Sequence, residues 1–174
     1  LMPWRRILDN VTLGLEVQGM ARRAAREKVL PLLPEFGLAG FERHYPSQLS
    51  GGMRQRAALL RTVVQQREML LLDEPFGALD ALTRAHLQDS VMQIHARLGN
   101  TMIMITHDVD EAVLLSDRIV MMTNGPSARI GEVLDVRLAR PRKRLDLVSD
   151  RTYIAAREAV LKFLYERHRF VEAA

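Results

Sequence analysis

Two short segments of this sequence carry residue types that suit the binding and cleavage of a phosphate anhydride. The first lies at residues 49–56, where Ser50, Gly51 and Gly52 open a predicted helix. Glycines let a phosphate group approach the backbone, and the free amides of a helix start attract anions. Ser50 can cap the helix and also donate to a phosphate oxygen. Taken alone, the three residues favour a plain helix cap after a loop.

The second segment is an apolar run at residues 69–72 that ends in two adjacent carboxylates, Asp73 and Glu74. In open α/β sheets, ligands bind beyond the carboxyl ends of the strands, where both side chains would fall. Phosphoryl transfer needs a metal ion at the phosphate oxygens and a group that orients the attacking water. Asp73 suits the shell of Mg²⁺, and Glu74 suits the polarisation of water. The alternative is a polar turn after a hydrophobic strand.

Two further residues lie at positions where they could take part in this chemistry. His107 follows the predicted strand 101–106, which places it at the same sheet edge as Glu74. A histidine there can contact a terminal phosphate through a ring nitrogen, although a structural role is the alternative. Asp80 precedes a predicted helix, and its alternative role is to cap that helix.

The elements that must position these residues follow from the spacing of apolar side chains. Helices are predicted at residues 8–33, with interruptions at Pro31 and Pro34, and from the Ser50 cap to about residue 64. Residues 45–49 should be extended, because a residue before proline avoids the helical region. A further amphipathic helix is predicted from four apolar residues that recur at helical spacing: Leu87, Val91, Ile94 and Leu98.

Strands are predicted at residues 69–72, 101–106, 118–123 and 129–134, with a hairpin turn at Asn124-Gly125 before the last. The continuous apolar character of 69–72 indicates a parallel strand covered on both faces. Asp108 and Glu111 form an acidic helix start. Residues 153–167 should form a terminal amphipathic helix with one apolar side, composed of Tyr153, Ala156, Val160, Leu161 and Leu164.

Strands that alternate with helices predict an α/β fold with a mostly parallel sheet. We divide the chain into a helical lobe at residues 1–65, an α/β core at 66–136, and a basic linker with the terminal helix at 137–174. The chain has no cysteine, which excludes disulfides and thiolate chemistry. Its net charge of +4 comes from scattered residues, mostly arginine, so we expect a solvated surface and no nucleic-acid partner. No apolar run is long enough to span a bilayer.

The ordered set of Leu-Ser-Gly-Gly, Leu-Leu-Asp-Glu-Pro, Ala-Leu-Asp and Thr-His-Asp resembles the ATP-binding subunit of ABC transporters. The resemblance implies a partial P-loop NTPase fold with ATP and Mg²⁺ as ligands. Ser50, Gly51 and Gly52 would contact the ATP held by the opposite subunit of a dimer. Asp73 would serve Mg²⁺ and Glu74 the catalytic water. His107 would contact the γ-phosphate, and Asp80 would serve communication across the dimer.

The finer resemblance is to the nitrate, sulfonate and taurine importers, through residues 1–5, 49–56 and 74–80. The tail from Tyr153 to Arg169 is most similar to nitrate-type members. The resemblance implies a second ATPase subunit, transmembrane permease subunits, a substrate-binding protein that acts indirectly, and a peripheral place on the cytoplasmic face of the bacterial inner membrane. It makes Trp4 and its neighbours a contact for the membrane partners. A sulfonate or taurine importer is the alternative.

The sequence contains no Gly-Lys pair, so the family's phosphate-binding P-loop lies outside it. We therefore expect a C-terminal fragment that does not hydrolyse ATP by itself and whose strands have uncovered apolar faces. One alternative is a truncated, non-catalytic binding or regulatory protein. A DNA-repair ATPase with the same signature is disfavoured, because such proteins carry coiled-coil insertions that this chain lacks.

Overall fold

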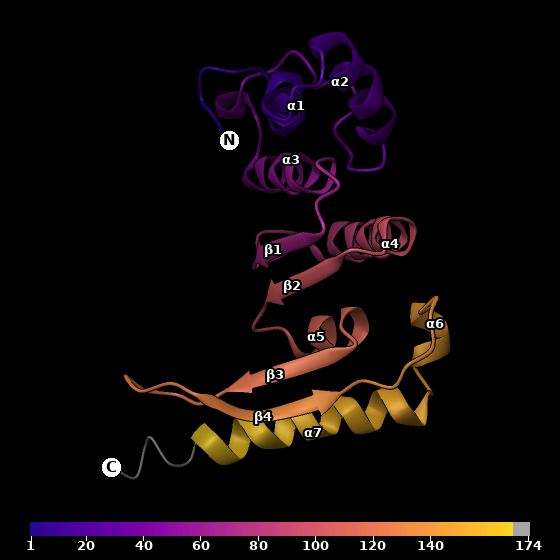
Figure 1. The fold of residues 1–174 in the computed structure, drawn as a ribbon. Helices are drawn as coiled ribbons and strands as arrows, with labels where there is room; N and C mark the ends of the chain where they lie inside the picture. The colour runs from indigo at the N-terminus through magenta and orange to yellow at the C-terminus, as the bar shows by residue number, and fades with distance from the viewer. Residues whose placement is uncertain (169–174) are drawn as a thin grey trace. The chain divides into compact units, whose positions relative to one another are not determined.

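The computed structural model describes residues 1–168, which form two compact units. The first unit comprises Leu1–Ile105 and the second begins at Thr106 (Figure 1). The three-part division at residues 65 and 136 stays a prediction.

The first unit begins with two helices where the sequence predicted one. Helix α1 spans Ile7–Val17 and α2 spans Arg22–Val29, which continues into a 3₁₀ turn at Leu30–Leu32. The prediction of continuous helix is wrong at residues 18–21, because Gly19 adopts a φ of 87° that ends α1. Asp9 of α1 then ties the helices together, since it accepts hydrogen bonds from Arg22 at 3.0 Å and Arg26 at 2.8 Å.

Helix α3 spans Gly51–Val63 and confirms the helix predicted after Ser50. The segment before it is extended only at its ends, at Tyr45 and Leu49, because Pro46–Gln48 forms a 3₁₀ turn. The Gln48 side chain accepts a hydrogen bond from the Tyr45 N–H at 2.7 Å, which closes that turn. Helix α3 packs against α1, and the side chain of Gln65, just after α3, lies over Gly14, where a β-carbon would be 2.4 Å from its Cδ.

The strands β1 (Met69–Asp73) and β2 (Thr101–Ile105) pair in parallel and flank α4 (Ala81–Leu98) in the sequence. Leu70 and Leu72 are buried on one face of this pair. The other face is apolar and exposed, formed by Met69, Leu71, Ile103 and Ile105 at 55%, 70%, 47% and 62% exposure. The strand register confirms the predicted parallel pairing. The prediction that residues 69–72 are covered on both faces is wrong for the described residues, because one face is exposed. That exposed face agrees with the separate expectation that a fragment would have an uncovered apolar strand face.

The second unit begins with α5 (Val109–Leu115) and the antiparallel pair β3 (Arg118–Met122) and β4 (Ile130–Asp135). The predicted hairpin is confirmed, and Gly125 adopts a φ of 98° within its loop. Helices α6 (Arg144–Leu147) and α7 (Arg151–His168) follow. Among residues 1–168, no helix has the length and hydrophobicity needed to cross a bilayer.

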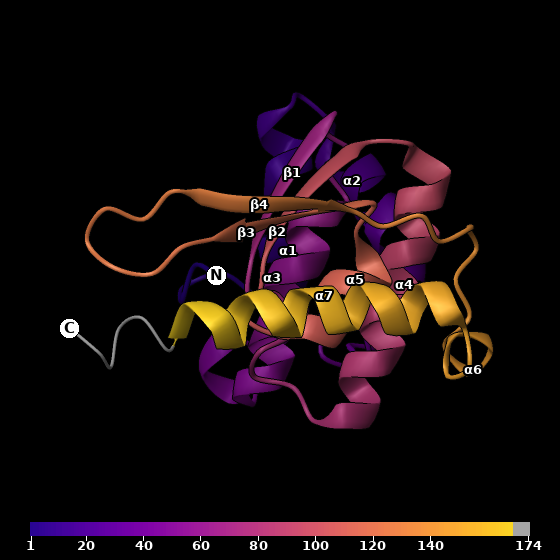
Figure 2. The same ribbon diagram turned by 90° about the horizontal axis from the view of Figure 1, so that it is seen from below.

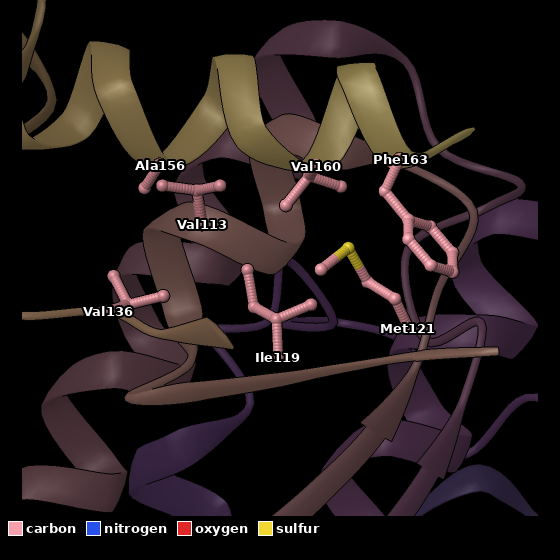
Figure 3. Packing of buried hydrophobic residues seen from close by; sticks show 7 residues of the cluster. All are labelled: Val113, Ile119, Met121, Val136, Ala156, Val160 and Phe163. Atoms are coloured by element: carbon pink, nitrogen blue, oxygen red, sulfur yellow. The ribbon is translucent and has the colours of Figure 1, made fainter. Parts of the chain in front are cut away.

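The core of the second unit forms between α5, β3 and α7. Figures 1 and 2 show α7 running beside the β3–β4 hairpin. Figure 3 shows side chains from these elements, together with Val136 just after β4, pointing toward one another: Val113, Ile119, Met121, Val136, Ala156, Val160 and Phe163. Ala156 and Val160 are buried as predicted, but Phe163 is buried instead of Leu164, because positions 156, 160 and 163 share one helical stripe. Arg169, the end of the nitrate-like tail, lies outside the described residues.

The predicted basic linker is fixed to the end of α5 through Arg142, whose side chain is fully buried. Its guanidinium donates at 2.8 Å to the carbonyls of Leu114 and Ser116 and to the carboxylate of Asp117. The last carbonyls of a helix have no partner within the helix. Burial lowers the pKa of Arg142, and the nearby Arg140 lowers it further. Arg142 therefore acts as a buried cap for α5.

Candidate functional site

The start of helix α3 presents Ser50, Gly51 and Gly52 at its N-terminal turn. The Ser50 hydroxyl accepts a hydrogen bond from the Met53 N–H at 3.2 Å, so the predicted cap is confirmed. The first amides of a helix have no intrahelical partner and carry partial positive charge. Ser50 and Gly51 are exposed. This turn therefore offers an accessible set of donors for an anion.

Gly52 is glycine for a reason that lies in the same chain. A β-carbon at this position would lie 3.2 Å from Cδ2 of Leu79 and 3.4 Å from the carbonyl oxygen of Ala78. A methyl group here would be tight, because the Leu79 side chain would have to shift by a few tenths of an ångström, whereas the distance to the Ala78 carbonyl is close to ordinary contact. The start of α3 is thus in direct contact with the segment that follows Glu74.

The carboxyl end of β1 presents Asp73 and Glu74, and both side chains are exposed. The Glu74 N–H donates to the carbonyl of Ile105 at 2.9 Å, which continues the β1–β2 pairing by one residue. Glu74 has a φ of 42°, in the left-handed region that costs energy for any residue with a β-carbon. Such strain occurs most often at functional positions, where the surrounding structure holds it in place.

Gln55 holds the turn that begins at Glu74. Its side-chain amide donates to the carbonyl of Glu74 at 2.8 Å and accepts from the N–H of Ala78 at 3.0 Å. The Gly77 N–H also donates to the Glu74 carbonyl, at 3.3 Å. The amide nitrogen and the amide oxygen of the Gln55 side chain therefore both link helix α3 to the turn at residues 74–78.

Asp80 lies just beyond this turn and caps α4. Its carboxylate accepts from the Thr83 N–H at 3.0 Å. Hydrogen bonds from the backbone and side chain of Thr83 lower the pKa of Asp80, so the group is ionised at neutral pH. The capping role that the sequence left open is confirmed, and a role in communication between subunits stays a prediction.

His107 lies in the second unit, one residue before the cap of α5. The Asp108 carboxylate accepts from the Glu111 N–H at 3.0 Å, which confirms the predicted acidic helix start. Glu111 is also buried and accepts from the Thr106 hydroxyl at 2.8 Å, while that hydroxyl accepts from the Asp108 N–H at 3.1 Å. These bonds fix the backbone on both sides of His107, which is itself exposed.

The residues at the end of β1 fit the requirements of Mg²⁺. Within residues 1–168, no group of three or more His, Asp or Glu side chains is arranged to hold a metal ion. Mg²⁺ does not need such a cage, because it is usually bound by one or two carboxylates together with water and substrate phosphates. An exposed Asp73 at a strand end meets this requirement.

The structure places Gly52 against Ala78 and Leu79, between the Glu74 turn and Asp80, a contact that the motifs alone did not predict. The sequence analysis missed Gln55, which links α3 to the Glu74 turn. A signal was present, because Gln55 lies three residues after Gly52 and so faces the same side of α3. Glutamine is common on exposed helix faces, however, and the sequence does not show which segment packs against that side.

The chain is similar to known proteins of one family. Residues 1–77 match the family model described as "ABC transporter". The chain is 50% identical over 170 residues to the nitrate transport protein NasD of Klebsiella oxytoca. It is 44% identical over 174 residues to the nitrate import ATP-binding protein NrtC, and 46% to the bicarbonate transport ATP-binding protein CmpC, both of Synechococcus elongatus.

Among solved structures, the dimeric bacterial ABC transporter cassette MJ0796 superposes with a TM-score of 0.70 at 29% identity. The match covers 80% of this chain and 60% of that one. A second match is the post-hydrolysis state of the same cassette, bound to ADP and phosphate. The chain spans 65% of the length of NasD and 26% of that of NrtC and of CmpC.

Proposed function

Because residues 1–77 match the ABC transporter family model and the chain is 50% identical to NasD, we propose that it belongs to the ATP-binding family of ABC transporters and forms the C-terminal part of an ATPase subunit that drives import of nitrate. The observation that carries the proposal is the 50% identity to NasD over 96% of the chain. The exposed donors at Ser50 and Gly51 and the exposed carboxylates of Asp73 and Glu74 are each of a type that suits ATP binding and hydrolysis.

In the proposed reaction, each residue has a role suited to its position. The hydroxyl of Ser50 and the amides of Gly51 and Gly52 donate to phosphate oxygens of the ATP held by a second subunit. Mg²⁺, held through Asp73, would neutralise charge on the phosphate oxygens when bound. Glu74 accepts a hydrogen bond from the attacking water and orients it.

Two further roles rest on the resemblance of short motifs. His107 is proposed to contact the terminal phosphate, on the basis of the Thr106-His107-Asp108 sequence alone. Asp80 is proposed to serve communication between subunits. Its place between the turn of residues 74–78 and the start of α4, which it caps, supports this role.

Bicarbonate is the second candidate substrate, because CmpC is 46% identical over 97% of the chain. Nitrate and bicarbonate are both small planar oxyanions. No residue described above recognises either, so we assign the choice of anion to partner subunits. The proposed partners are a second ATPase subunit and membrane permease subunits, at the cytoplasmic face of the inner membrane.

Trp4 suits contact with such a partner. It is 72% exposed, yet the segment that carries it is fixed, because the buried Asn10 amide donates to the carbonyls of Met2 at 3.0 Å and Arg5 at 2.8 Å. A tryptophan presented on an ordered loop provides a large contact area at low entropic cost.

The proposal is tested with a chimera in which residues 1–174 replace the matching segment of NasD. We expect the chimera to hydrolyse ATP and to restore ¹⁵N-nitrate uptake in a strain that lacks NasD. Glu74→Gln should lower turnover by roughly 100-fold or more, because it removes the acceptor for the attacking water. The matched control is Glu158→Gln, on an exposed position of α7, which should leave turnover unchanged.

Three results would contradict the proposal. Hydrolysis that persists in Glu74→Gln would show that another group orients the water. Uptake of bicarbonate without nitrate would favour the second candidate. ATP turnover by residues 1–174 alone would refute the assignment of phosphate binding to a P-loop outside these residues.

A further inference from the structure

We propose that Gln55 is a positioning residue for the Glu74 carboxylate, and that it links the nucleotide-contacting start of α3 to the hydrolytic turn of the same subunit. The inference rests on the proposed function of Glu74. It is carried by an arrangement that the roles assigned above do not explain. One side chain of α3 uses both its amide nitrogen and its amide oxygen on the turn of residues 74–78.

The two hydrogen bonds act on the part of the turn that determines where Glu74 points. The φ of 42° at Glu74 is disfavoured, so the backbone would relax toward ordinary angles without external support. Gln55 donates to the carbonyl of Glu74 itself and accepts from the Ala78 N–H four residues later. Both ends of the turn are thereby held against one helix, and rotation at Glu74 would break these bonds.

The left-handed backbone of Glu74 also determines the position of its side chain. A β-carbon on Gly77 would lie 3.4 Å from Oε2 of Glu74, so the carboxylate lies over the glycine of its own turn. A relaxed backbone at Glu74 would move the carboxylate away from this position. Misplacement of a reacting group by about 1 Å can lower a rate by roughly 100-fold.

The same contacts provide a route between two proposed ATP contacts. Helix α3 begins at Ser50, which is proposed to contact the ATP of the opposite subunit, and Gln55 lies within two turns of that start. Gly52 adds a second contact with the same segment, against Leu79 and the Ala78 carbonyl. Displacement of the start of α3 by a nucleotide would therefore be transmitted to the turn that carries Glu74.

The first test uses the chain of residues 1–174 and measures amide hydrogen exchange at Ala78. Gln55→Met keeps the length of the side chain but removes donor and acceptor. We expect exchange at Ala78 to become at least about fivefold faster, the effect of losing one hydrogen bond. In Gln55→Glu the acceptor remains, so protection of Ala78 should be retained. Gln93→Met, at an exposed position of α4, is the matched control and should change nothing.

The second test measures kcat and the KM for ATP in the NasD chimera. We expect Gln55→Met to lower kcat by roughly tenfold to 100-fold with KM nearly unchanged, since the carboxylate is misplaced while the phosphate contacts are kept. Gln55→Glu should also lower kcat, because it removes the donor to the Glu74 carbonyl. If Gln55 had only a structural role, Gln55→Met would lower thermal stability but would not lower kcat selectively with KM unchanged.

The outcomes separate the two proposals. If the unmodified chimera shows no hydrolysis that depends on Glu74, the proposed function fails, and the exchange at Ala78 still decides whether Gln55 holds the turn. If hydrolysis depends on Glu74 but Gln55→Met leaves kcat or the Ala78 exchange rate unchanged, the role of Gln55 is overturned.

Discussion

The left-handed backbone at Glu74 predicts an unusual response to substitution. At most positions, glycine is less stable than alanine, because glycine loses more backbone entropy on folding. At a φ of 42° the order should reverse, since alanine keeps the β-carbon that clashes and glycine does not. We therefore expect Glu74→Gly to be more stable than Glu74→Ala.

The size of the difference follows from two opposing terms. Left-handed geometry costs a residue with a β-carbon roughly 1–2 kcal/mol, and the greater entropy loss of glycine offsets roughly 0.5–1 kcal/mol of that. The net advantage of Glu74→Gly over Glu74→Ala should be about 0.5–1 kcal/mol. Both variants lose the same carboxylate, so its contacts cancel in the comparison.

The assay is urea-induced unfolding followed by far-UV circular dichroism and by the fluorescence of Trp4, the only tryptophan of the chain, which lies in the same unit as Glu74. The control pair is Gln93→Gly and Gln93→Ala within α4, where glycine should be less stable by about 1 kcal/mol. If Glu74→Gly is less stable than Glu74→Ala, the strain argument is refuted. In the chimera both variants should lack hydrolysis, so the stabilised variant would be inactive.

Three further predictions concern stability, pH and the exposed strand face. Arg142→Met should lower the free energy of unfolding by about 3 kcal/mol, because several short hydrogen bonds of a buried guanidinium are lost. Arg140→Met is the control and should lower it by only about 1 kcal/mol. Equal losses for the two variants in urea titrations would contradict the special role of Arg142. Asp9 is partly buried, which opposes ionisation, but hydrogen bonds from Arg26 and Arg22 lower its pKa. The stabilisation of the folded state by the Asp9 carboxylate is therefore present above the unfolded-state pKa and is lost as pH falls through the folded-state pKa. Asp9→Asn should lower the free energy of unfolding by about 1 kcal/mol at pH 7 and by progressively less below about pH 4. A loss of stability that does not depend on pH would contradict a role of the ion pairs. Finally, the double variant Leu71→Ser, Ile103→Ser should associate with itself less and bind less of an apolar dye, because both side chains are exposed on one strand face. Light scattering measures the self-association and fluorescence measures the dye binding. Unchanged self-association would mean that another surface is responsible.

The local elements of this protein were readable from its sequence because their causes are local. Ser50 caps α3 through its own helix, and Asp108 caps α5 in the same way. The helix α4 and the hairpin at Gly125 follow from spacing and turn chemistry. Gly19 shows the limit of this reasoning, since the apolar spacing suggested one helix where the glycine separates two.

What the tertiary structure alone decided depends on residues that are distant in the chain. The ordered motifs predicted the resemblance to ABC transporters that the comparisons also found, and they suggested roles for the carboxylates. They did not show that Gln55 bonds residues 19 and 23 positions away, or that Arg142 enters the end of a helix 26–29 positions earlier. The left-handed backbone of Glu74 belongs to the same class, because ordinary propensities disfavour it and only the packed surroundings hold it. Short-range hydrogen bonds and apolar periodicity are encoded within a few residues, whereas the partner of a long polar side chain is fixed only when helices and strands have packed.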